Sequence, residues 1–469
     1  MFMRISALLI GAAIAVAVQP ARRPVALLIT GGTVVTMDAA GRVLSPGAVA
    51  IDGQEVVAID TPDALAARFT ARETIDAAGQ VVMPGLINTH THAPMVLYRG
   101  LADDLALMEW LQKYIFPAEA KTVSREFVRA GTRLAALEMI QSGTTTYTDM
   151  YYFEEEIAAV TKAAGLRGVL GQTIIQFPVA DAKTPVEELA RTEAFLRQFA
   201  GDELIVPAIA PHSMYTLDRA TLQSVRALAM RTAAPVLIHL SETRDEMNTS
   251  QQKHNATPAA YLQRIGFWGP AAGAGPGPRT LAAHGVWLTP GDMQILARHH
   301  VGVSHNPESN MKLASGAAKV VAMRGSGIAV GIGTDGAASN NDLDMFEAVR
   351  QAALLAKLQT GDPRAVPART ALEMGTIEGA RALGMEQRIG SLEPGKRADV
   401  ITVSMGAARQ TPLYDVMSHL VYTTRGDDVR NTIVNGRVLM RDRRVLTLDE
   451  AAVLSEARAF AEKVRAAVR

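Results

Sequence analysis

Eight short apolar runs divide the central part of the chain, and helical patterns separate most of them. A strand followed by a helix and then by a second strand is the repeating unit of a parallel sheet. Eight such units predict an α/β fold in which a (β/α)8 TIM barrel closes around a core of Val, Ile and Leu; a doubly wound open sheet is the alternative. The runs cover residues 81–90, 144–150, 167–174, 204–212, 234–241, 279–284, 300–305 and 328–334.

The two ends of the chain contain strand and turn patterns instead of these alternating units. Residues 23–82 and 386–446 hold β-prone runs separated by dipeptides that are typical of tight turns. Neither segment has enough strands for an independent domain. We therefore predict one small β-sandwich domain built from both segments, with the barrel, residues 83–385, inserted between them. The turn dipeptides are Gly31-Gly32, Asp52-Gly53 and Asn435-Gly436.

Three segments outside the strand patterns have their own signals. Residues 1–22 combine Arg4 with an apolar run that is too short to span a membrane, which is typical of a signal peptide. This predicts an exported or periplasmic protein with no stable membrane insertion after the leader is removed. If the segment is only a frayed apolar extension, the protein is cytoplasmic. The Gly-, Pro- and Ala-rich residues 269–278 predict a surface loop, and residues 447–469 predict a C-terminal helix.

The composition excludes several classes of site. Lys and Arg total 47, as do Asp and Glu, so the net charge is zero and no basic excess predicts a nucleic-acid partner. The chain has no cysteine, which excludes disulfides, thiolate nucleophiles and every metal site with a Cys ligand. Any metal must therefore be held by His, Asp or Glu. The predicted partner is a small-molecule substrate, and assembly into a homo-oligomer stays open.

Histidines and an aspartate fall at the ends of the predicted barrel strands. His90 and His92 close the first strand, where side chains two apart point the same way. His239 closes the fifth strand and Asp335 follows the eighth. The carboxyl ends of all barrel strands meet at one mouth, where the active sites of such barrels lie. These four residues predict one divalent metal per subunit: Zn²⁺, with Fe²⁺ or Mn²⁺ as alternatives because a His/Asp set accepts several metals.

Further side chains at this mouth suit hydrolytic chemistry. A water bound to such a metal ionises near neutral pH. We predict that Asp335, besides binding the metal, takes the proton of this water, and that His284, at the end of the sixth strand, hydrogen-bonds it. Glu242, three residues beyond His239, is predicted to protonate a ring nitrogen or leaving group. The simpler interpretations are a core residue for His284, a helix cap for Glu242 and a turn for Asp335-Gly336.

Several ordered motifs resemble the amidohydrolase superfamily, specifically its 5′-methylthioadenosine/S-adenosylhomocysteine deaminase group and the related chlorohydrolases. The resemblance runs from about residue 27 to 450 and does not include the leader. The motifs are PGLINTHTHAPM (84–95), HLSET (239–243), SHNPESN (304–310), GTDGAASN (333–340) and GSLEPGKRAD (390–399), the last being typical of the return into that superfamily's β-sandwich.

The resemblance implies a mononuclear zinc and hydrolytic deamination of an aminated heterocycle by attack of metal-bound hydroxide and release of ammonia. The expected substrate is an adenine nucleoside such as 5′-methylthioadenosine or S-adenosylhomocysteine. The resemblance also implies that Glu119 and His212 contact the substrate, together with Glu242 and Asp335. Two positions depart from the group: Gln172 stands near the third strand, where arginine is usual, and Gly285 follows His284, where cysteine is frequent.

Two other functions stay open. An enzyme of the same superfamily could cleave a cyclic amide, or remove chloride or an amine from another azine or purine-like ring. Measuring ammonia release across nucleosides and cyclic amides separates these reactions. The second alternative is a non-catalytic exported binding protein on a hydrolase scaffold. Loss of a metal ligand or of Glu242 would favour it, and none of these residues is missing.

Overall fold

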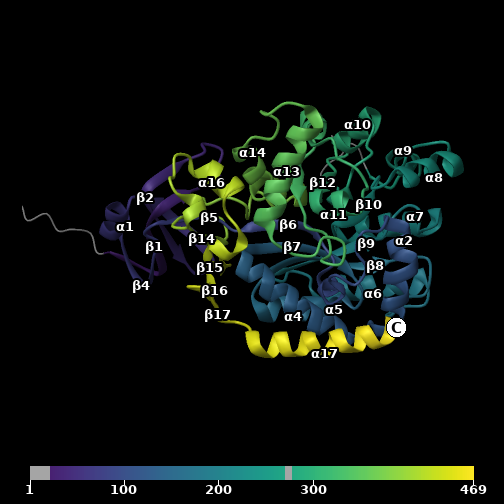
Figure 1. Cartoon of the computed structure of the whole chain (residues 1–469), viewed down its shortest axis with the longest axis horizontal. Helices are drawn as coiled ribbons and strands as arrows, with labels where there is room; N and C mark the ends of the chain where they lie inside the picture. The colour runs from purple at the N-terminus through teal and green to yellow at the C-terminus, as the bar shows by residue number, and fades with distance from the viewer. Residues whose placement is uncertain (1–21, 270–276, 469) are drawn as a thin grey trace, which may run out of the picture.

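The structure, a computed structural model, describes residues 22–269 and 277–468. Strands from the two ends of the chain lie side by side at one end of the molecule, purple and yellow in Figure 1, and the larger barrel lies next to them. The predicted leader, residues 1–22, and the predicted loop, residues 269–278, fall almost entirely outside the described residues and stay predictions. Within the described part of the chain, no helix is long and apolar enough to cross a membrane.

Eight parallel strands close into a barrel, in which the last strand pairs with the first. This confirms the predicted (β/α)8 barrel and excludes the open sheet. Nearly all strand side chains are buried, because helices cover the outside of the barrel and packed side chains fill its inside. The strands are β6 (Leu86–Thr91), β7 (Thr144–Tyr151), β8 (Arg167–Ile174), β9 (Ile205–Pro211), β10 (Val236–Leu240), β11 (Thr280–His284), β12 (Gly302–His305) and β13 (Val330–Ile332).

The first apolar run serves both parts of the molecule. Its first half, β5 (Gln80–Pro84), pairs with β14 (Val400–Ser404) in the terminal sheet, and β6 of the barrel begins after a single residue. That residue is Gly85, where a Cβ would lie 2.1 Å from the side chain of Thr145. The close approach requires glycine and fixes where the first strand of the metal site enters the barrel.

The terminal strands form one nine-stranded mixed sheet, which confirms a composite β-domain. Strand β5 joins its halves, because it pairs with β1 in parallel and with β14 antiparallel. The hairpins predicted at Asp52-Gly53 and Asn435-Gly436 are confirmed, between β2 and β3 and between β15 and β16. The remaining strands are β1 (Arg23–Val35), β2 (Val43–Asp52), β3 (Glu55–Asp60), β4 (Phe69–Asp76), β15 (Val429–Val434), β16 (Arg437–Arg441) and β17 (Arg444–Val445).

The hairpin predicted at Gly31-Gly32 is wrong. Strand β1 runs through both glycines, and shifts in its register against β2 around Gly32 mark a bulge. Gly31 has φ +86°, and a Cβ on Gly32 would lie 2.8 Å from the carbonyl oxygen of Gln80. The two glycines therefore permit a bulge and a close backbone approach. Glycine pairs occur in bulges as well as in turns, so the dipeptide does not distinguish the two.

Helices follow the barrel strands, and the C-terminal helix packs against the outside of one of these helices. Helix α4 (Arg125–Ser142) begins at its cap Ser124 and ends at Gly143, which has φ +87°. Helix α17 (Glu450–Val468) packs along α4 (Figure 1), and an ion pair of 2.8 Å joins Arg133 to Glu456 between them. The other helices are α1 (Pro62–Arg68), η1 (Ala93–Tyr98), α2 (Leu107–Trp110), η2 (Leu111–Ile115), α3 (Phe116–Thr122), α5 (Glu154–Ala164), α6 (Pro185–Gln198), α7 (Arg219–Thr232), α8 (Arg244–His254), α9 (Pro258–Arg264), α10 (Pro290–Arg298), α11 (Pro307–Lys312), α12 (Val320–Gly325), α13 (Met345–Thr360), α14 (Ala368–Met374), α15 (Ile377–Leu383), η3 (Ala408–Gln410), α16 (Val416–Tyr422) and η4 (Gly426–Asp428).

Candidate metal centre and substrate pocket

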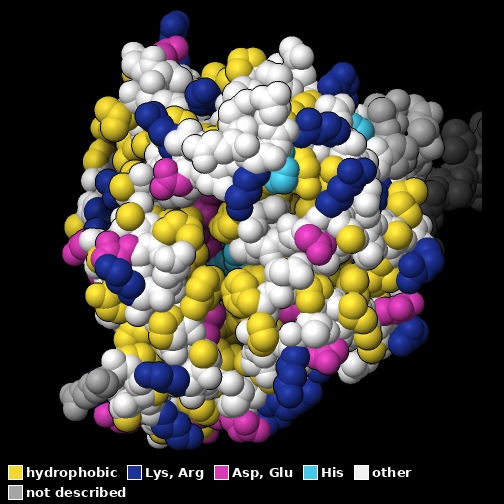
Figure 2. All heavy atoms as spheres, turned by 90° about the vertical axis from the view of Figure 1, so that its right-hand side faces the viewer, with side chains coloured by type: hydrophobic (Ala, Val, Ile, Leu, Met, Phe, Trp, Pro, Cys, Tyr) yellow, Lys and Arg dark blue, Asp and Glu magenta, His cyan; other side chains and the backbone are white. Residues whose placement is uncertain are grey.

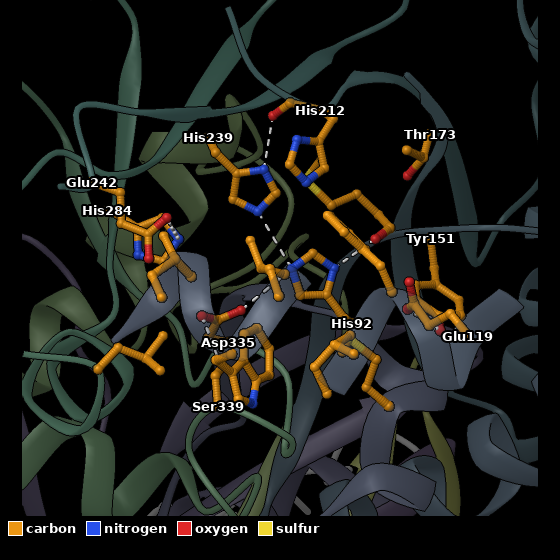
Figure 3. Close-up of a pocket in the computed structure, with 18 of the residues that line it drawn as sticks. His92, Glu119, Tyr151, Thr173, His212, His239, Glu242, His284, Asp335 and Ser339 are labelled. Carbon is orange, nitrogen blue, oxygen red and sulfur yellow. Dashed lines mark hydrogen bonds and ion pairs between the residues drawn. The ribbon is translucent and has the colours of Figure 1, made fainter. Parts of the chain in front are cut away.

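Four side chains from three different strand ends converge at the mouth of the barrel. Nε2 of His90 and Nε2 of His92 each lie 3.4 Å from Oδ1 of Asp335. Nε2 of His239, on β10, lies 3.4 Å from Nε2 of His92. Figure 3 shows His92, His239 and Asp335 directed toward one another. Ligand atoms about 2.1 Å from one tetrahedral zinc lie about 3.4 Å apart, so these spacings fit a single ion.

Hydrogen bonds hold two of the histidine rings in the orientation that a metal requires. Nδ1 of His92 lies 2.7 Å from the carbonyl oxygen of Met150, and Nδ1 of His239 lies 2.8 Å from that of His212. A carbonyl only accepts, so each Nδ1 donates its hydrogen and each Nε2 keeps a free lone pair. Nε2 of His90 is buried, and no hydrogen-bond partner for it occurs among the described residues. These donors fit a divalent cation.

Asp335 is held so that one oxygen faces the histidines. Its other oxygen, Oδ2, accepts hydrogen bonds from Ser309 at 2.7 Å and from Ser339 at 3.1 Å. Burial opposes ionisation, but contact with His90 and the charges of nearby imidazoles outweigh it and hold the pKa of Asp335 well below its ordinary value. The backbone of Asp335 has φ +65°, an uncommon conformation for a non-glycine residue. Asp335 therefore does not only form a turn: its carboxylate is held by two serine hydroxyls and faces the histidines.

Removal of the Ser339 hydroxyl tests this arrangement. We expect Ser339→Ala to weaken metal affinity by about 10-fold to 100-fold, because Asp335 loses one of the contacts that orient it. Competition with a chelator measures the affinity. The control is Ser315→Ala, which removes a buried hydroxyl that has no hydrogen bond within the described residues. Equal metal affinities in the two variants would contradict the role assigned to Ser339.

Glu242 enters the pocket from the loop after β10 and is not a helix cap. Helix α8 is capped by Thr243, whose hydroxyl accepts from the backbone N–H of Glu246. Glu246 in turn accepts from the backbone N–H groups of Ser241 and Glu242, at 2.9 and 2.8 Å. These bonds fix the loop and leave the Glu242 carboxyl free. Burial, and then the charge of Asp335, raise the pKa of Glu242 despite nearby imidazoles. A raised pKa suits a group that carries a proton.

His284 faces Glu242 from the end of β11. Its Nε2 lies 3.9 Å from Oε2 of Glu242, and its Nδ1 lies 2.9 Å from Oδ1 of Asn310. The amide oxygen of Asn310 accepts, so Nδ1 donates and Nε2 is presented to the centre. Burial opposes protonation of this ring, but the carboxylates of Glu242 and Asp335 outweigh it and raise the pKa of His284. The residue lines the pocket and is not an ordinary core histidine.

A pocket of about 630 Å³, including its open mouth, extends from these residues. Glu242 and His284 lie at one end of the close-up in Figure 3, and Glu119 and Tyr151 lie at the other. The face shown in Figure 2 is hollowed near its centre, where histidine and acidic side chains lie among hydrophobic ones. Met95, Leu107, Trp110 and Leu111 are among the apolar side chains of the wall. Polar side chains thus extend through the pocket from Glu242 to Glu119, with apolar side chains beside them in the wall.

Glu119 is a buried carboxyl at the end of the pocket opposite the metal centre. Oε1 of Glu119 accepts a hydrogen bond of 2.6 Å from the hydroxyl of Tyr151. Burial raises the pKa of Glu119 to about 7, although the hydrogen bond from Tyr151 acts in the opposite direction. His212 also lines the pocket, and burial lowers the pKa of its imidazole to about 3, so the ring is neutral. Both residues line the pocket, and their contact with a substrate stays a prediction.

Gln172 does not line the pocket. Its side chain is buried, and its Nε2 donates to Asp181 at 2.9 Å. The residue of β8 that lines the pocket is Thr173, the next in the chain. Ser339 and Asn310 lie within the family motifs but were assigned no role from sequence, and Glu246 and Tyr151 were not singled out. Only their spacing from recognised residues was informative, since Ser339 and Glu246 each lie four residues after a predicted site residue.

Comparison with known proteins identifies the family. Residues 81–439 match the sequence pattern of the Amidohydrolase family. The chain belongs to the amidohydrolase family. Membership establishes a hydrolase that cleaves C–N bonds, in agreement with a metal-type donor set at the mouth of a barrel.

Individual relatives match almost the whole chain. The 5-methylthioadenosine/S-adenosylhomocysteine deaminase of Syntrophobacter fumaroxidans is 46% identical over 440 residues, which are 94% of this chain and 98% of the relative. The 5′-deoxyadenosine deaminase of Methanosarcina acetivorans is also 46% identical over 440 residues, with 93% and 98% covered. A crystal structure of an adenosine deaminase from Xanthomonas campestris with bound zinc has a TM-score of 0.91 and 39% identity, and covers 95% of this chain and 100% of its own.

Proposed function

We propose that this amidohydrolase is a zinc-dependent deaminase of adenine nucleosides such as 5′-methylthioadenosine, S-adenosylhomocysteine or 5′-deoxyadenosine. The observation that carries the proposal is the two-ended pocket, with a metal-type donor set and a proton-carrying Glu242 at one end and the buried carboxyl of Glu119 at the other. A purine fits the first end and a ribose the second. The names and the near-complete coverage of the relatives support the same substrate class.

The metal would be held by His90, His92, His239 and Asp335. When bound, it lowers the pKa of a coordinated water and so supplies a nucleophile at neutral pH. The reaction joins the oxygen of water to the ring carbon that bears the amino group. The bond from that carbon to the exocyclic nitrogen breaks, and the nitrogen leaves as ammonia with its own two hydrogens and one proton from the water. The second proton of the water balances the one that the ring nitrogen keeps.

Three residues of the chain accept, donate or hydrogen-bond the protons that move in this reaction. Asp335, kept ionised by its surroundings, accepts a proton from the attacking water. His284, fixed by Asn310, hydrogen-bonds the same water through Nε2. Glu242 gives a proton to the neighbouring ring nitrogen, which makes the ring carbon a better electrophile. Each of these side chains is at least about nine-tenths buried, so bulk water competes little with these transfers.

Glu119 and His212 bind the substrate and do not take part in proton transfer. An ionised Glu119 accepts hydrogen bonds from ribose hydroxyls, and the Tyr151 hydroxyl holds its other acceptor position. The neutral His212 ring offers one donor or acceptor beside the His239 ring, whose centroid lies 4.8 Å away. These contacts place the nucleoside lengthwise in the pocket, with its amino group at the metal end.

A panel of compounds tests the proposal, with turnover measured as ammonia released from nucleosides and cytosine, chloride released from a chlorinated triazine, and loss of a cyclic amide. We expect zinc-loaded protein to deaminate 5′-methylthioadenosine, 5′-deoxyadenosine and adenosine, with one zinc per chain by elemental analysis. Cytosine, a chlorinated triazine and a cyclic amide are expected to react at least about 100-fold more slowly, because they place no hydroxyl at Glu119. Faster turnover of any of these three than of every nucleoside would replace the proposed function with the corresponding alternative.

The pKa of Glu119 predicts a pH dependence of substrate binding. Burial raises this pKa to about 7, so below pH 7 the carboxyl of the free enzyme is mostly protonated and is a poorer acceptor for ribose hydroxyls. We expect KM for 5′-deoxyadenosine to rise as the pH falls from 8 to 6, by about fivefold to tenfold. Tyr151→Phe removes a hydrogen bond that favours the ionised form, so the midpoint should move to higher pH. Glu119→Gln should raise KM and abolish its dependence on pH; a wild-type KM that is constant over this range would contradict the assignment.

A further inference from the structure

A second cavity adjoins the pocket beyond Glu119, and we name it the annex. It shares Phe116, Glu119 and Tyr152 with the pocket, and residues 177–180 of the loop after β8 line its solvent-exposed side. Phe177 packs edge-on against Phe116, with ring centroids 5.4 Å apart. The annex is therefore a mainly apolar extension of the pocket at the end that lies away from the metal centre.

The annex contains no cation among the described residues that line it, and Glu119 is its one charged side chain. The pocket itself is also without Lys or Arg in its described lining. The cations that lie near this lining in sequence are paired elsewhere or exposed. Lys121, next to Ala120, donates to the carbonyl oxygen of Ala467 at 2.8 Å, and Lys113 pairs with Glu109 at 2.9 Å. Arg191 pairs with Glu155 at 2.9 Å and approaches Asp181 at 3.5 Å. Lys183 is exposed and lines neither cavity.

The proposed substrate brings its 5′ substituent to this place. A purine held at Glu242 and a ribose held at Glu119 lie along the pocket, and the 5′ carbon is attached to the ring atom next to the one that bears the 3′ hydroxyl. A group on the 5′ carbon therefore passes beside Glu119 into the annex. We infer that, within the proposed substrate class, the enzyme prefers adenine nucleosides whose 5′ substituent carries no negative charge, so that S-adenosylhomocysteine is a much poorer substrate than 5′-methylthioadenosine. This inference rests on the proposed function.

The discrimination follows from the carboxylate of the homocysteine group. In the annex this carboxylate would find no cation among the described lining residues and would lie near the like charge of the Glu119 carboxylate. The ammonium of the same group has Glu119 as a partner of opposite charge, so the carboxylate is the group that costs affinity. A methylthio or methyl group instead meets Phe116, Tyr152 and Phe177, which favour apolar contact. We expect kcat/KM for S-adenosylhomocysteine to be about 100-fold below that for 5′-methylthioadenosine.

One matched compound separates the effect of the negative charge of the 5′ substituent from the effect of its length. 5′-(3-Aminopropylthio)-5′-deoxyadenosine is S-adenosylhomocysteine without its carboxylate, and we expect its kcat/KM to lie within about tenfold of that of 5′-methylthioadenosine. S-adenosylhomocysteine turnover within tenfold of methylthioadenosine turnover would overturn the inference and leave the proposed function intact. Equally poor turnover of both long compounds would also overturn it, because length would then be the selected property. Absence of deamination with every nucleoside would overturn the proposed function itself, and the inference with it.

A binding measurement and a pair of variants complete the test. Calorimetry on the zinc-loaded enzyme should show that the product 5′-methylthioinosine binds about 100-fold more tightly than S-inosylhomocysteine. Ala180, exposed at the rim of the annex, accommodates a longer side chain. Ala180→Arg should raise the ratio of kcat/KM for S-adenosylhomocysteine to kcat/KM for 5′-methylthioadenosine at least fivefold, whereas Ala180→Gln should leave this ratio close to that of the wild type. Equal S-adenosylhomocysteine rates in the two variants would contradict the placement of the 5′ substituent in the annex.

Discussion

Glu242→Gln lowers kcat by about 10³-fold while the protein keeps its metal. This result is expected because glutamine has the shape of the glutamate but cannot carry the proton that the ring nitrogen needs, and general acid catalysis contributes about 10²-fold to 10⁴-fold. Burial raises the pKa of Glu242, so the group holds a proton readily. Steady-state ammonia release from 5′-deoxyadenosine measures kcat, and elemental analysis measures zinc.

The matched control for this variant is Glu188→Gln. Glu188 is also buried, but it does not line the pocket. Its Oε2 accepts a hydrogen bond from the backbone N–H of Ile175, so the variant can lose stability. It should nevertheless retain kcat within about fivefold of the wild type at a temperature where both are folded. A Glu242→Gln enzyme with wild-type kcat would show that another group delivers the proton.

The sequence was sufficient to predict which side chains meet at the candidate metal centre, because barrel topology brings the ends of distant strands to the same mouth. His92 and His239 are far apart in the chain, yet each follows an apolar run that ends at the same mouth. Once eight βα units are recognised, strand ends must meet, whichever loops connect them. The period of two along a strand then places His90 on the same side as His92.

The strand pairing of the terminal sheet could not be predicted in the same way. Pairing of β5 with both β1 and β14 joins segments that are more than 300 residues apart, and no local pattern specifies such a register. The domain boundary predicted between residues 82 and 83 falls within the apolar run 81–90, close to Gly85, where the structure divides the run between β5 and β6. The bulge at Gly31-Gly32 was read as a turn because both structures use glycine for its positive φ or its missing Cβ.

The residues that support the site were the least predictable part of it. Asn310 reaches His284 from α11, and Glu246 reaches the loop of Glu242 from α8, so both contacts depend on how helices pack over the barrel mouth. Serine, asparagine and glutamate are common on protein surfaces, so their presence after a strand does not by itself indicate a role in a site. Tyr151 is a further example, since its hydroxyl meets Glu119 only because α3 lies against the end of β7.

His239→Ala is expected to abolish turnover, by at least about 10⁴-fold, because three donors remain where four are needed to hold the ion and shape its surroundings. Zinc content after dialysis should fall well below one per chain. Thermal unfolding should also lose the increase in midpoint that added zinc gives the wild type, since an ion that binds only the folded state stabilises it.

The control is His300→Asn, which changes an exposed histidine whose φ of +52° asparagine accepts. It should match the wild type in rate, in zinc content and in its response to added zinc. The loss in His239→Ala can then be assigned to one coordinating nitrogen rather than to histidine content. If His239→Ala kept one tightly bound zinc and the full rate, the convergence of His90, His92, His239 and Asp335 would be a packing arrangement, and the catalytic centre would have to be sought elsewhere in the barrel.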